Sequence, residues 1–326
     1  MIDIEFSEPV SVMHSEILDY LEVALVDGLY EPPIKLDTLA KALRVNPTHA
    51  SAIEFKRNTL AFVLELDPML SLHHVKCFIQ DYLTFGNGYF QVIRERYQQT
   101  PVGIKHLPAL YMRRRGGDLG YTYKPSLYDD KGRINFRKEQ VFHLAEYDIA
   151  QEIYGLPSHV SALTSIWLNE DATLFRRQYY RNGSHAGYLL FVNDPNMTKT
   201  QEDEFKRRLG NTKGQAFRNI FINGKGSMKE PPELKPIGHI EAKDAFLNLT
   251  KQTTSDILTI HRVPLELMSI RREGITSSND LNKVDWLFHK NELLPLAESL
   301  LQINQFVGKE VIKIKPYTNL DSQLAD

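Results

Sequence analysis

The sequence has very little cysteine, no long apolar run and no large charge of either sign, and each absence excludes a class of protein. Cys77 is the single cysteine among 326 residues, so the chain can form no internal disulfide and no thiolate metal cluster, which favours a reducing compartment. The most apolar segment, residues 60–72, is interrupted by Glu65, Asp67 and Pro68 and is too short to span a membrane. The first ten residues lack the basic and apolar regions of a signal peptide, so we expect a soluble, cytoplasmic chain with no membrane partner.

A strong overall charge is also missing. The formal net charge of -2 gives no global electrostatic reason to bind nucleic acid, so any contact with DNA must be local or transient. The stretch from Ala186 to Ile240 departs from this balance, because it holds nine lysines and arginines against six acidic residues. This stretch is the more basic part of a nearly neutral chain.

Motifs that carry catalytic or cofactor chemistry are not found. The residues GKGS at 224–227 lack the spacing of a phosphate-binding loop, and the sequence has neither a GxSxG elbow nor a dinucleotide fingerprint. His73 and His74 are adjacent, so on a helix they point about 100° apart and cannot form the i, i+4 pair that binds zinc. We therefore predict no enzyme, no cofactor and no metal site. A nuclease, the enzyme class left open, would need a cluster of carboxylates to hold a metal ion.

Three long helices dominate the second half of the chain. Apolar residues at helical spacing predict a helix from Pro157 to Gly183 and a second from Glu241 to His261, which ends before Val263-Pro264. A third helix is predicted from Asn279 to Phe306, with a kink at its internal Pro295. Between the first two helices, the pattern predicts a small β-α-β insert with strands at 187–192 and 216–222 around a helix at 200–209.

The first half of the chain reads as α+β. A helix at 71–84 is followed by strands at 89–93, 104–108, 121–123 and 140–144, and a closing strand is predicted at 310–314. Arg113, Arg114 and Arg115 lie between two of these strands. A solvated loop is the favoured interpretation of this triplet, and a phosphate clamp is the alternative.

The segment Leu36–Asn58 superficially looks like a helix-turn-helix, with two helices split at Asn46-Pro47. Arg44 stands where that motif usually has glycine, which weakens the match. A DNA-binding regulator using this segment is nevertheless the alternative function, and it would give a dimer with a sequence-specific footprint.

Seven stretches, in order along the chain, resemble a single family. They are FGNGYF at 85–90, IKHLPALYMRR at 104–114, VFHLAEYDIAQEIYGLPSHVSAL at 141–163, LNEDATLFRRQYYRNGSHAGYLL at 168–190, AKDAFLNL at 242–249, HRVPLELM at 261–268 and NELLPLAESLLQIN at 291–304. Each stretch is modest alone, but together they closely resemble the portal proteins of tailed bacteriophages, of the PBSX type found in contractile-tailed phages and prophages. The resemblance covers residues 5–317.

This resemblance implies an α+β portal-protein fold whose parts match the elements predicted above. The implied parts are most of a wing at 1–155, a first stem helix at 156–185, a β-α-β clip insert at 186–240, a second stem helix at 241–262, a tunnel loop at 263–278, a kinked tunnel helix with a closing wing strand at 279–317, and a polar tail at 318–326. A helical crown, present in larger portals, is expected to be small or absent.

The resemblance also implies a function. Portal proteins form a ring, typically of twelve identical subunits, at one vertex of the capsid in the virion, after assembly in the cytoplasm of the bacterial host. Double-stranded DNA passes through the ring without sequence specificity during packaging and ejection. The implied partners are terminase, the major capsid and scaffold proteins, and the head-completion or neck proteins.

Three groups of residues are candidates for these contacts. The tunnel loop is expected to line the DNA channel with Arg271, Arg272, Glu273, Ser277, Ser278 and Asn279, where mixed charges allow weak contact with phosphate. The clip is expected to dock terminase through Lys206, Arg207, Arg208, Lys213 and Arg218. Candidates for burial by neighbouring subunits are Trp167, Phe175, Trp286 and Phe288, for each of which a core position within its own chain is equally consistent with the sequence.

Overall fold

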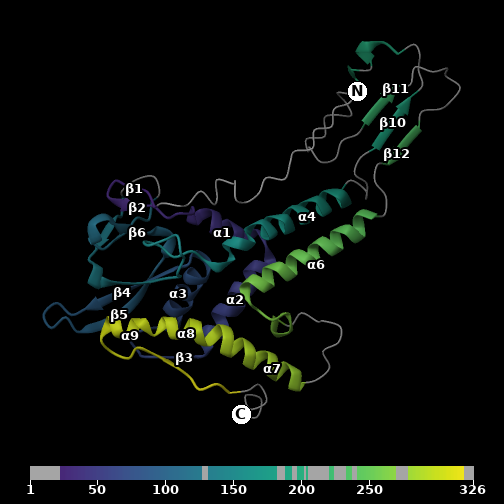
Figure 1. Ribbon diagram of the computed structural model, residues 1–326. Coiled ribbons are helices and arrows are strands. Elements are labelled where there is room, and N and C mark those ends of the chain that lie inside the picture. The colour runs from purple at the N-terminus through teal and green to yellow at the C-terminus, as the bar shows by residue number, and fades with distance from the viewer. Residues whose placement is uncertain are drawn as a thin grey trace. The chain divides into compact units, whose positions relative to one another are not determined.

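The computed structural model describes residues 23–126, 131–181, 188–192, 197–201, 203–204, 220–223, 233–236, 241–268 and 278–318 (Figure 1). The chain divides into two compact units. The first unit combines residues 1–166 with 256–326, and the second consists of residues 167–255.

Three consecutive helices begin the described part of the first unit: α1 (Leu36–Val45), α2 (Pro47–Phe62) and α3 (Leu72–Phe85). Helix α2 starts as its sequence predicts, because the Asn46 side chain accepts a hydrogen bond from the backbone N–H of His49 at 2.9 Å and Pro47 occupies the first turn. Helix α3 is capped by Ser71 and ends at Gly86, whose φ of 69° is the left-handed conformation that glycine accepts without strain.

Helix α3 packs on a three-stranded antiparallel sheet of order β5-β4-β9, formed by β4 (Asn87–Arg94), β5 (Pro101–Leu107) and β9 (Val141–Ala145). The ring of Phe78 on α3 stacks on the ring of Phe90 on β4, with centroids 4.1 Å apart. Gly88 is required beneath this stack, because a Cβ there would lie 2.6 Å from the Phe78 ring. The helix predicted at 71–84 and the strands predicted at 89–93, 104–108 and 140–144 are therefore confirmed.

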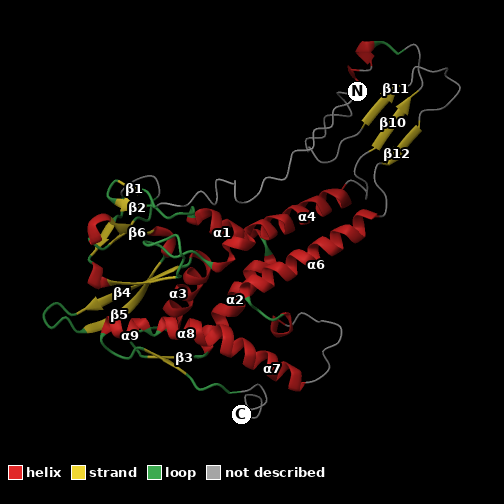
Figure 2. Ribbon diagram, viewed as in Figure 1, coloured by secondary structure: helices red, strands yellow, loops and turns green. Residues whose placement is uncertain are grey.

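A second antiparallel sheet has five strands, in the order β1-β2-β6-β7-β8. Its strands are β1 (Leu25–Val26), β2 (Leu29–Tyr30), β6 (Met112–Arg115), β7 (Tyr121–Tyr123) and β8 (Ile134–Phe136) (Figure 2). Of these, only β7 is predicted by the sequence. The others are two to four residues long and are defined by pairing with their neighbours rather than by a pattern of their own.

The long helix predicted near the C-terminus is interrupted just before Pro295. Helix α7 (Ser278–Phe288) leads into a π-helical turn at His289–Leu293, and α8 (Leu294–Leu300) and α9 (Gln302–Val307) follow. Pro295 lies in the first turn of α8, where its missing N–H leaves the carbonyl four residues earlier, that of Asn291, without its usual helical donor. The sequence predicts a kink at Pro295, and what the structure shows there is a π-helical turn just before the proline.

The chain then returns to the start of the first unit. Strand β13 (Ile312–Ile314) pairs antiparallel with β3 (Leu64–Leu66), which confirms the predicted closing strand. The core of this unit draws buried side chains from α2, α3, the β5-β4-β9 sheet and α8–α9, including Leu60, Phe78, Phe90, Leu300 and Ile303.

The second unit contains most of two long helices and a small sheet. Helix α4 (Leu163–Arg181) follows a 3-10 turn at Ser158–Ala162, and α6 (Glu241–His261) has the predicted bounds. Asn169 on α4 donates a 2.7 Å hydrogen bond to the Thr253 hydroxyl on α6, so the two helices lie side by side (Figure 1).

The small sheet has the order β11-β10-β12, formed by β10 (Tyr188–Val192), β11 (Ile220–Asn223) and β12 (Glu233–Pro236). Strands β10 and β11 are parallel, as the predicted β-α-β insert requires, and residues 199–201 and 203–204 between them are helical. The third strand, β12, runs antiparallel to β10 and is not predicted by the sequence.

None of the described helices combines the length and the apolar character needed to cross a bilayer.

Candidate functional site

The predicted DNA-contacting loop lies largely outside the described residues. Arg271, Arg272, Glu273 and Ser277 belong to the segment 269–277, which the structure does not describe, while Ser278 and Asn279 begin helix α7. Their assignment to a channel remains a prediction.

The same holds for the basic residues predicted to dock terminase. All five lie within the segment 205–219, which is outside the described residues: Lys206, Arg207, Arg208, Lys213 and Arg218. The structure describes only the sheet of the same insert and residues 197–201 and 203–204.

The candidates for a subunit interface divide by exposure. Trp286 on α7 is 46 % exposed, and the Lys290 ammonium lies 4.9 Å from the centre of its ring. Trp167 on α4 is partly buried, and the side chain of Phe175 is outside the described part. Trp286 therefore keeps a large apolar surface available to a neighbour.

Phe288 belongs to the core of its own chain. Its side chain is 3 % exposed and lies in the main hydrophobic cluster, with its ring centroid 5.8 Å from that of Phe55 on α2. The interpretation of Phe288 as an interface residue is therefore corrected, because its burial in the core of its own chain leaves almost no side-chain surface for a neighbouring subunit.

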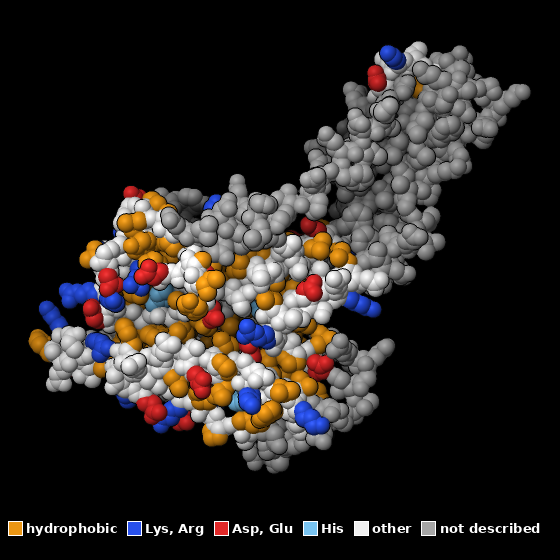
Figure 3. Space-filling view, viewed as in Figure 1, with side chains coloured by type: hydrophobic (Ala, Val, Ile, Leu, Met, Phe, Trp, Pro, Cys, Tyr) orange, Lys and Arg blue, Asp and Glu red, His pale blue; other side chains and the backbone are white. Residues whose placement is uncertain are grey.

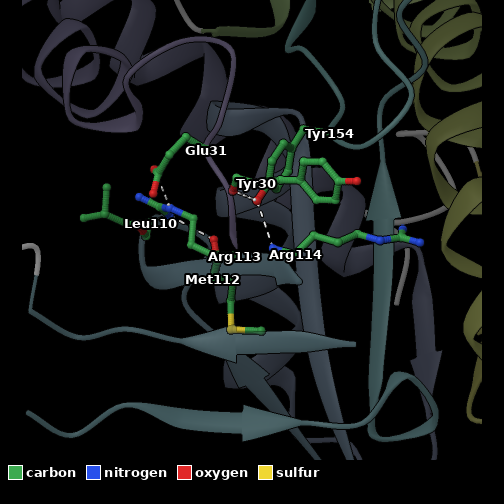
Figure 4. Close-up of polar contacts among 7 residues, drawn as sticks. All are labelled: Tyr30, Glu31, Leu110, Met112, Arg113, Arg114 and Tyr154. Atoms are coloured by element: carbon green, nitrogen blue, oxygen red, sulfur yellow. Dashed lines mark hydrogen bonds and ion pairs between the residues drawn. The ribbon is translucent and has the colours of Figure 1, made fainter. Parts of the chain in front are cut away.

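The arginine triplet forms strand β6, so the predicted loop is wrong there. Arg113 is buried, and its guanidinium donates to the Glu31 carboxylate at 3.0 Å and to the carbonyls of Leu110 and Met112 at 3.0 and 2.9 Å (Figure 4). These contacts occupy three of the five N–H donors of the guanidinium and hold it against its own sheet, which disfavours a phosphate clamp.

The neighbouring Arg114 is held by its backbone as well as by its side chain. Its N–H donates to the Tyr154 hydroxyl at 2.9 Å, and that hydroxyl donates to the carbonyl of Tyr30 at 2.7 Å (Figure 4). Burial raises the pKa of Tyr154 to about 12, so the hydroxyl keeps the proton that it donates. The Arg114 guanidinium pairs with Asp118 at 2.8 Å and lies 5.8 Å from the ring centre of Tyr121. The triplet is therefore part of the framework of the five-stranded sheet.

The surface of the described residues carries both signs of charge. On the face shown in Figure 3, lysines and arginines are interspersed with aspartates and glutamates and do not form a patch of one sign among the described residues. This distribution agrees with the nearly neutral composition.

The most unusual polar arrangement of the first unit is a buried joint around helix α2. His49 and Lys56 are seven residues apart, which is about two helical turns, so they lie on the same face of α2. Their residues are 0 % and 4 % exposed, although polar side chains are rarely buried so completely. His49 contacts His261 at the end of helix α6, and Lys56 contacts Glu292 in the π-helical turn.

Lys56 forms the ionic half of this joint. Its ammonium pairs with one carboxylate oxygen of Glu292 in the π-helical turn, and the other oxygen lies 3.2 Å from the Arg262 guanidinium. Burial lowers the pKa of Lys56, and the nearby carboxylate of Glu292 opposes that shift. Arg262, the residue after α6, adopts a left-handed φ of 54° as the chain turns toward Val263-Pro264.

Three histidines form the other half. His49 Nδ1 and His261 Nε2 are 2.8 Å apart, and the His159 ring centroid lies 4.6 Å from that of His49 and 5.6 Å from that of His261. Burial lowers the pKa of His49 to about 4 and of His261 to about 3, and it also lowers the pKa of His159. All three are therefore neutral at neutral pH. Among the described residues, no group of histidine, cysteine or acidic side chains is arranged to hold a metal ion.

The sequence gives little sign of these buried contacts, because the residues that make them are far apart in the chain. Lys56 and Glu292 are 236 residues apart, and His49 and His261 are 212 residues apart. The only local signal is the position of His49 three residues after the Asn46 cap.

The geometry and burial of helices α1 and α2 also test the helix-turn-helix alternative. Helices α1 and α2 are separated by Asn46 alone, whereas the motif joins its helices through about three to four residues. The face of α2 that carries His49, Ala52, Ile53 and Lys56 is buried in the first unit. These observations disfavour α2 as a helix that enters a DNA groove.

Comparisons with known proteins agree with one another. The family model described as phage portal protein matches residues 41–318. A protein of Escherichia phage P2, named as a probable portal protein, is 38 % identical over 317 residues, which is 96 % of this chain and 90 % of the relative. A protein of Haemophilus phage HP1 with the same name is 32 % identical over 308 residues, covering 92 % of this chain and 89 % of the relative. Among solved structures, the neck of a native gene transfer agent particle, computed with C12 symmetry, matches with a TM-score of 0.64 at 15 % identity, covering 89 % of this chain and 85 % of that one.

Proposed function

The chain belongs to the phage portal protein family, and on this premise we propose that it forms a ring of twelve subunits at one capsid vertex. DNA would pass through this ring during packaging and ejection. The observation that carries the proposal is the match to the family along nearly the whole chain. The C12 symmetry of the gene transfer agent neck supports the number twelve.

We assign parts of the chain to parts of a portal subunit. Residues 1–155 would form most of the wing, 156–185 and 241–262 the two stem helices, 186–240 the clip, 263–278 the tunnel loop, 279–317 the tunnel helix with the closing strand, and 318–326 a tail. The order of the described elements supports this division, because α4 and α6 flank the β10–β12 sheet and α7–α9 follow.

Terminase, capsid, scaffold and neck proteins are the proposed partners, and the virion is the proposed location after assembly in the host cytoplasm. The PBSX subtype and the absence of enzymatic activity stay predictions. The family itself is structural, which supports a role in assembly.

The primary test is the mass and symmetry of the purified protein. Native mass spectrometry and negative-stain imaging, with and without scaffold protein, should show a closed ring with a central hole. A discrete dimer that binds a specific DNA sequence would contradict the ring and favour a regulator that uses Leu36–Asn58.

The exposed Trp286 is proposed to contact a neighbouring subunit. Trp286→Ala should lower the fraction of chain in rings, because an exposed aromatic side chain gains most from burial at an interface. Tyr97→Ala, at the 87 % exposed tip between β4 and β5, is the matched control. An unchanged ring yield for Trp286→Ala would remove this residue from the interface.

We propose that the tunnel loop contacts DNA through Arg271 and Arg272. A channel in which DNA slides cannot hold phosphates tightly, because each fixed basic contact adds to salt-dependent binding. The double substitution Arg271→Ala and Arg272→Ala should reduce packaging and DNA retention, while Arg96→Ala on the exposed β4–β5 turn should not. Normal packaging by the double variant would end this assignment.

The clip is proposed to dock terminase through its basic residues. Charge reversal at Arg207, Arg208 and Lys213 should weaken terminase binding in a pull-down and leave the ring assembled. Arg96→Glu serves as the control for a change of charge elsewhere on the chain. Unchanged terminase binding would instead favour a clip that only joins neighbouring subunits.

A further inference from the structure

The three buried histidines join three segments that the chain brings together from a distance. His49 lies in the first turn of α2, His159 in the 3-10 turn that leads into α4, and His261 is the last residue of α6. All three are at most 3 % exposed. The cluster therefore lies where the start of α4 and the end of α6 meet α2, all within the first unit.

Two nitrogens of this cluster have no hydrogen-bond partner. His49 Nδ1 is paired with His261 Nε2, but Nε2 of His49 and Nε2 of His159 are buried without one. If one of these nitrogens gained a proton, the new N–H group would find no hydrogen-bond acceptor. A proton on either of them would create a buried, unpaired charge.

The charges around the cluster make protonation harder. On α2, Lys56 is the cation that lowers the pKa of both His159 and His261. The carboxylate of Glu292, from the π-helical turn, is already engaged by Lys56 and by Arg262, the residue that follows α6. From the 3-10 turn, His159 itself is the titratable group that faces the other two. No described acidic group contributes to the pKa of any of the three histidines.

We propose that His49, His159 and His261 form an acid-sensitive catch, which holds the start of α4 and the end of α6 against α2 while neutral and releases them when protonated. The catch rests on packing within one chain, so it stands whether or not the proposed ring is correct. In a portal subunit it would act where the two stem helices meet the wing.

The size of the effect follows from linkage. Because the folded pKa values are lowered, the stabilisation is complete above the ordinary histidine pKa of about 6.5 and is lost as the pH falls below it. The relevant equilibrium is between the closed state, in which the start of α4 and the end of α6 pack on α2, and the open state, in which they are released. A histidine that stays neutral in the closed state but titrates freely in the open state increases the open-to-closed ratio about tenfold between pH 7.5 and 5.5. The pKa values of His49 and His261 are about 4 and 3, and that of His159 is also lowered, so the three histidines should together give about a 1000-fold increase.

Hydrogen exchange measured by mass spectrometry on the full chain tests this inference. Peptides covering 46–56, 156–166 and 253–263 are compared at pH 7.5 and 5.5 after correction for the intrinsic pH dependence of exchange. We expect these three segments to lose protection at pH 5.5 by a larger factor than the buried strand β4. Equal loss in β4, or no loss in the three segments, would overturn the catch.

Substitution provides a second test. In the double variant His159→Gln and His261→Gln, the increase of the opening equilibrium between pH 7.5 and 5.5 should be about 100-fold smaller than in the wild type. The reason is that glutamine is polar but does not titrate. His73→Gln, at an exposed position on α3, is the matched control and should retain the wild-type pH profile. A double variant with the wild-type profile would assign the effect to other groups. If the variant does not fold, the comparison of segments in the wild-type chain still decides the question.

Discussion

Replacing Glu292 by glutamine would remove the carboxylate from the buried ion pair with Lys56. The side chains of the pair are only 5 % and 8 % exposed, so water cannot take the place of the missing charge. An isolated buried charge of this kind costs about 3–5 kcal/mol, and we expect Glu292→Gln to destabilise the first unit by that amount.

The two cations that contact Glu292 should respond very differently. The Arg262 side chain is 69 % exposed, so Arg262→Ala should cost at most about 1 kcal/mol, as for other exposed ion pairs. Lys56→Met should cost less stability than Glu292→Gln and more than Arg262→Ala. Glu292 would keep Arg262 as a partner, and methionine would fill the space of the lysine stem. The combined change Lys56→Met and Glu292→Leu should recover most of the loss, since no unpaired charge is then left in the core.

Urea denaturation followed by Trp286 fluorescence measures these differences. The chain has two tryptophans, so a Trp167→Phe background leaves Trp286 on α7 as the reporter of the first unit. All variants are compared at one protein concentration, because assembly would add a concentration-dependent term. Equal costs for Glu292→Gln and Arg262→Ala would refute the reasoning, as would a double variant no more stable than Glu292→Gln.

The same variant has a distinct pH dependence. Burial lowers the pKa of Lys56, and removal of Glu292 takes away the charge that opposes this shift. A lysine with a lowered folded pKa binds fewer protons when folded, so stability rises with pH up to the unfolded value of about 10.4. The cost of Glu292→Gln should therefore shrink between pH 7 and 10, and a constant cost would contradict a charged, unpaired Lys56.

Two further predictions concern positions that the backbone fixes. Gly155→Ala should destabilise the fold strongly, because a Cβ there would lie 2.3 Å from backbone atoms of Glu146 and Gly86, whereas Gly103→Ala, whose nearest contact is 3.9 Å, should be nearly neutral in thermal melting. Asn46→Ala should cost about 1–2 kcal/mol in urea denaturation, because it removes both the cap of α2 and a buried hydrogen bond to the Ile166 carbonyl. A loss of under 0.5 kcal/mol would mean that the cap contributes little.

Local patterns accounted for the elements that are long or sharply bounded. Helix α6 matches its predicted bounds, because it is followed closely by Val263-Pro264, which cannot continue a helix. The division of α1 from α2 at Asn46 was predictable for the same kind of reason, a cap followed by proline. The strand formed by Arg113, Arg114 and Arg115 was not, because it depends on pairing with β2 and β7 rather than on its own residues.

The sequence by itself determined the helices, most of the larger strands and the family resemblance, since these depend on neighbouring residues or on motifs in a fixed order. Only the tertiary structure decided which polar residues are buried together. His49 and His261, or Lys56 and Glu292, carry no local sign of their pairing, because a contact across more than 200 residues is set by how the helices pack. The same packing turned Phe288 from a candidate interface residue into a core residue and left Trp286, two residues earlier on the same helix, exposed.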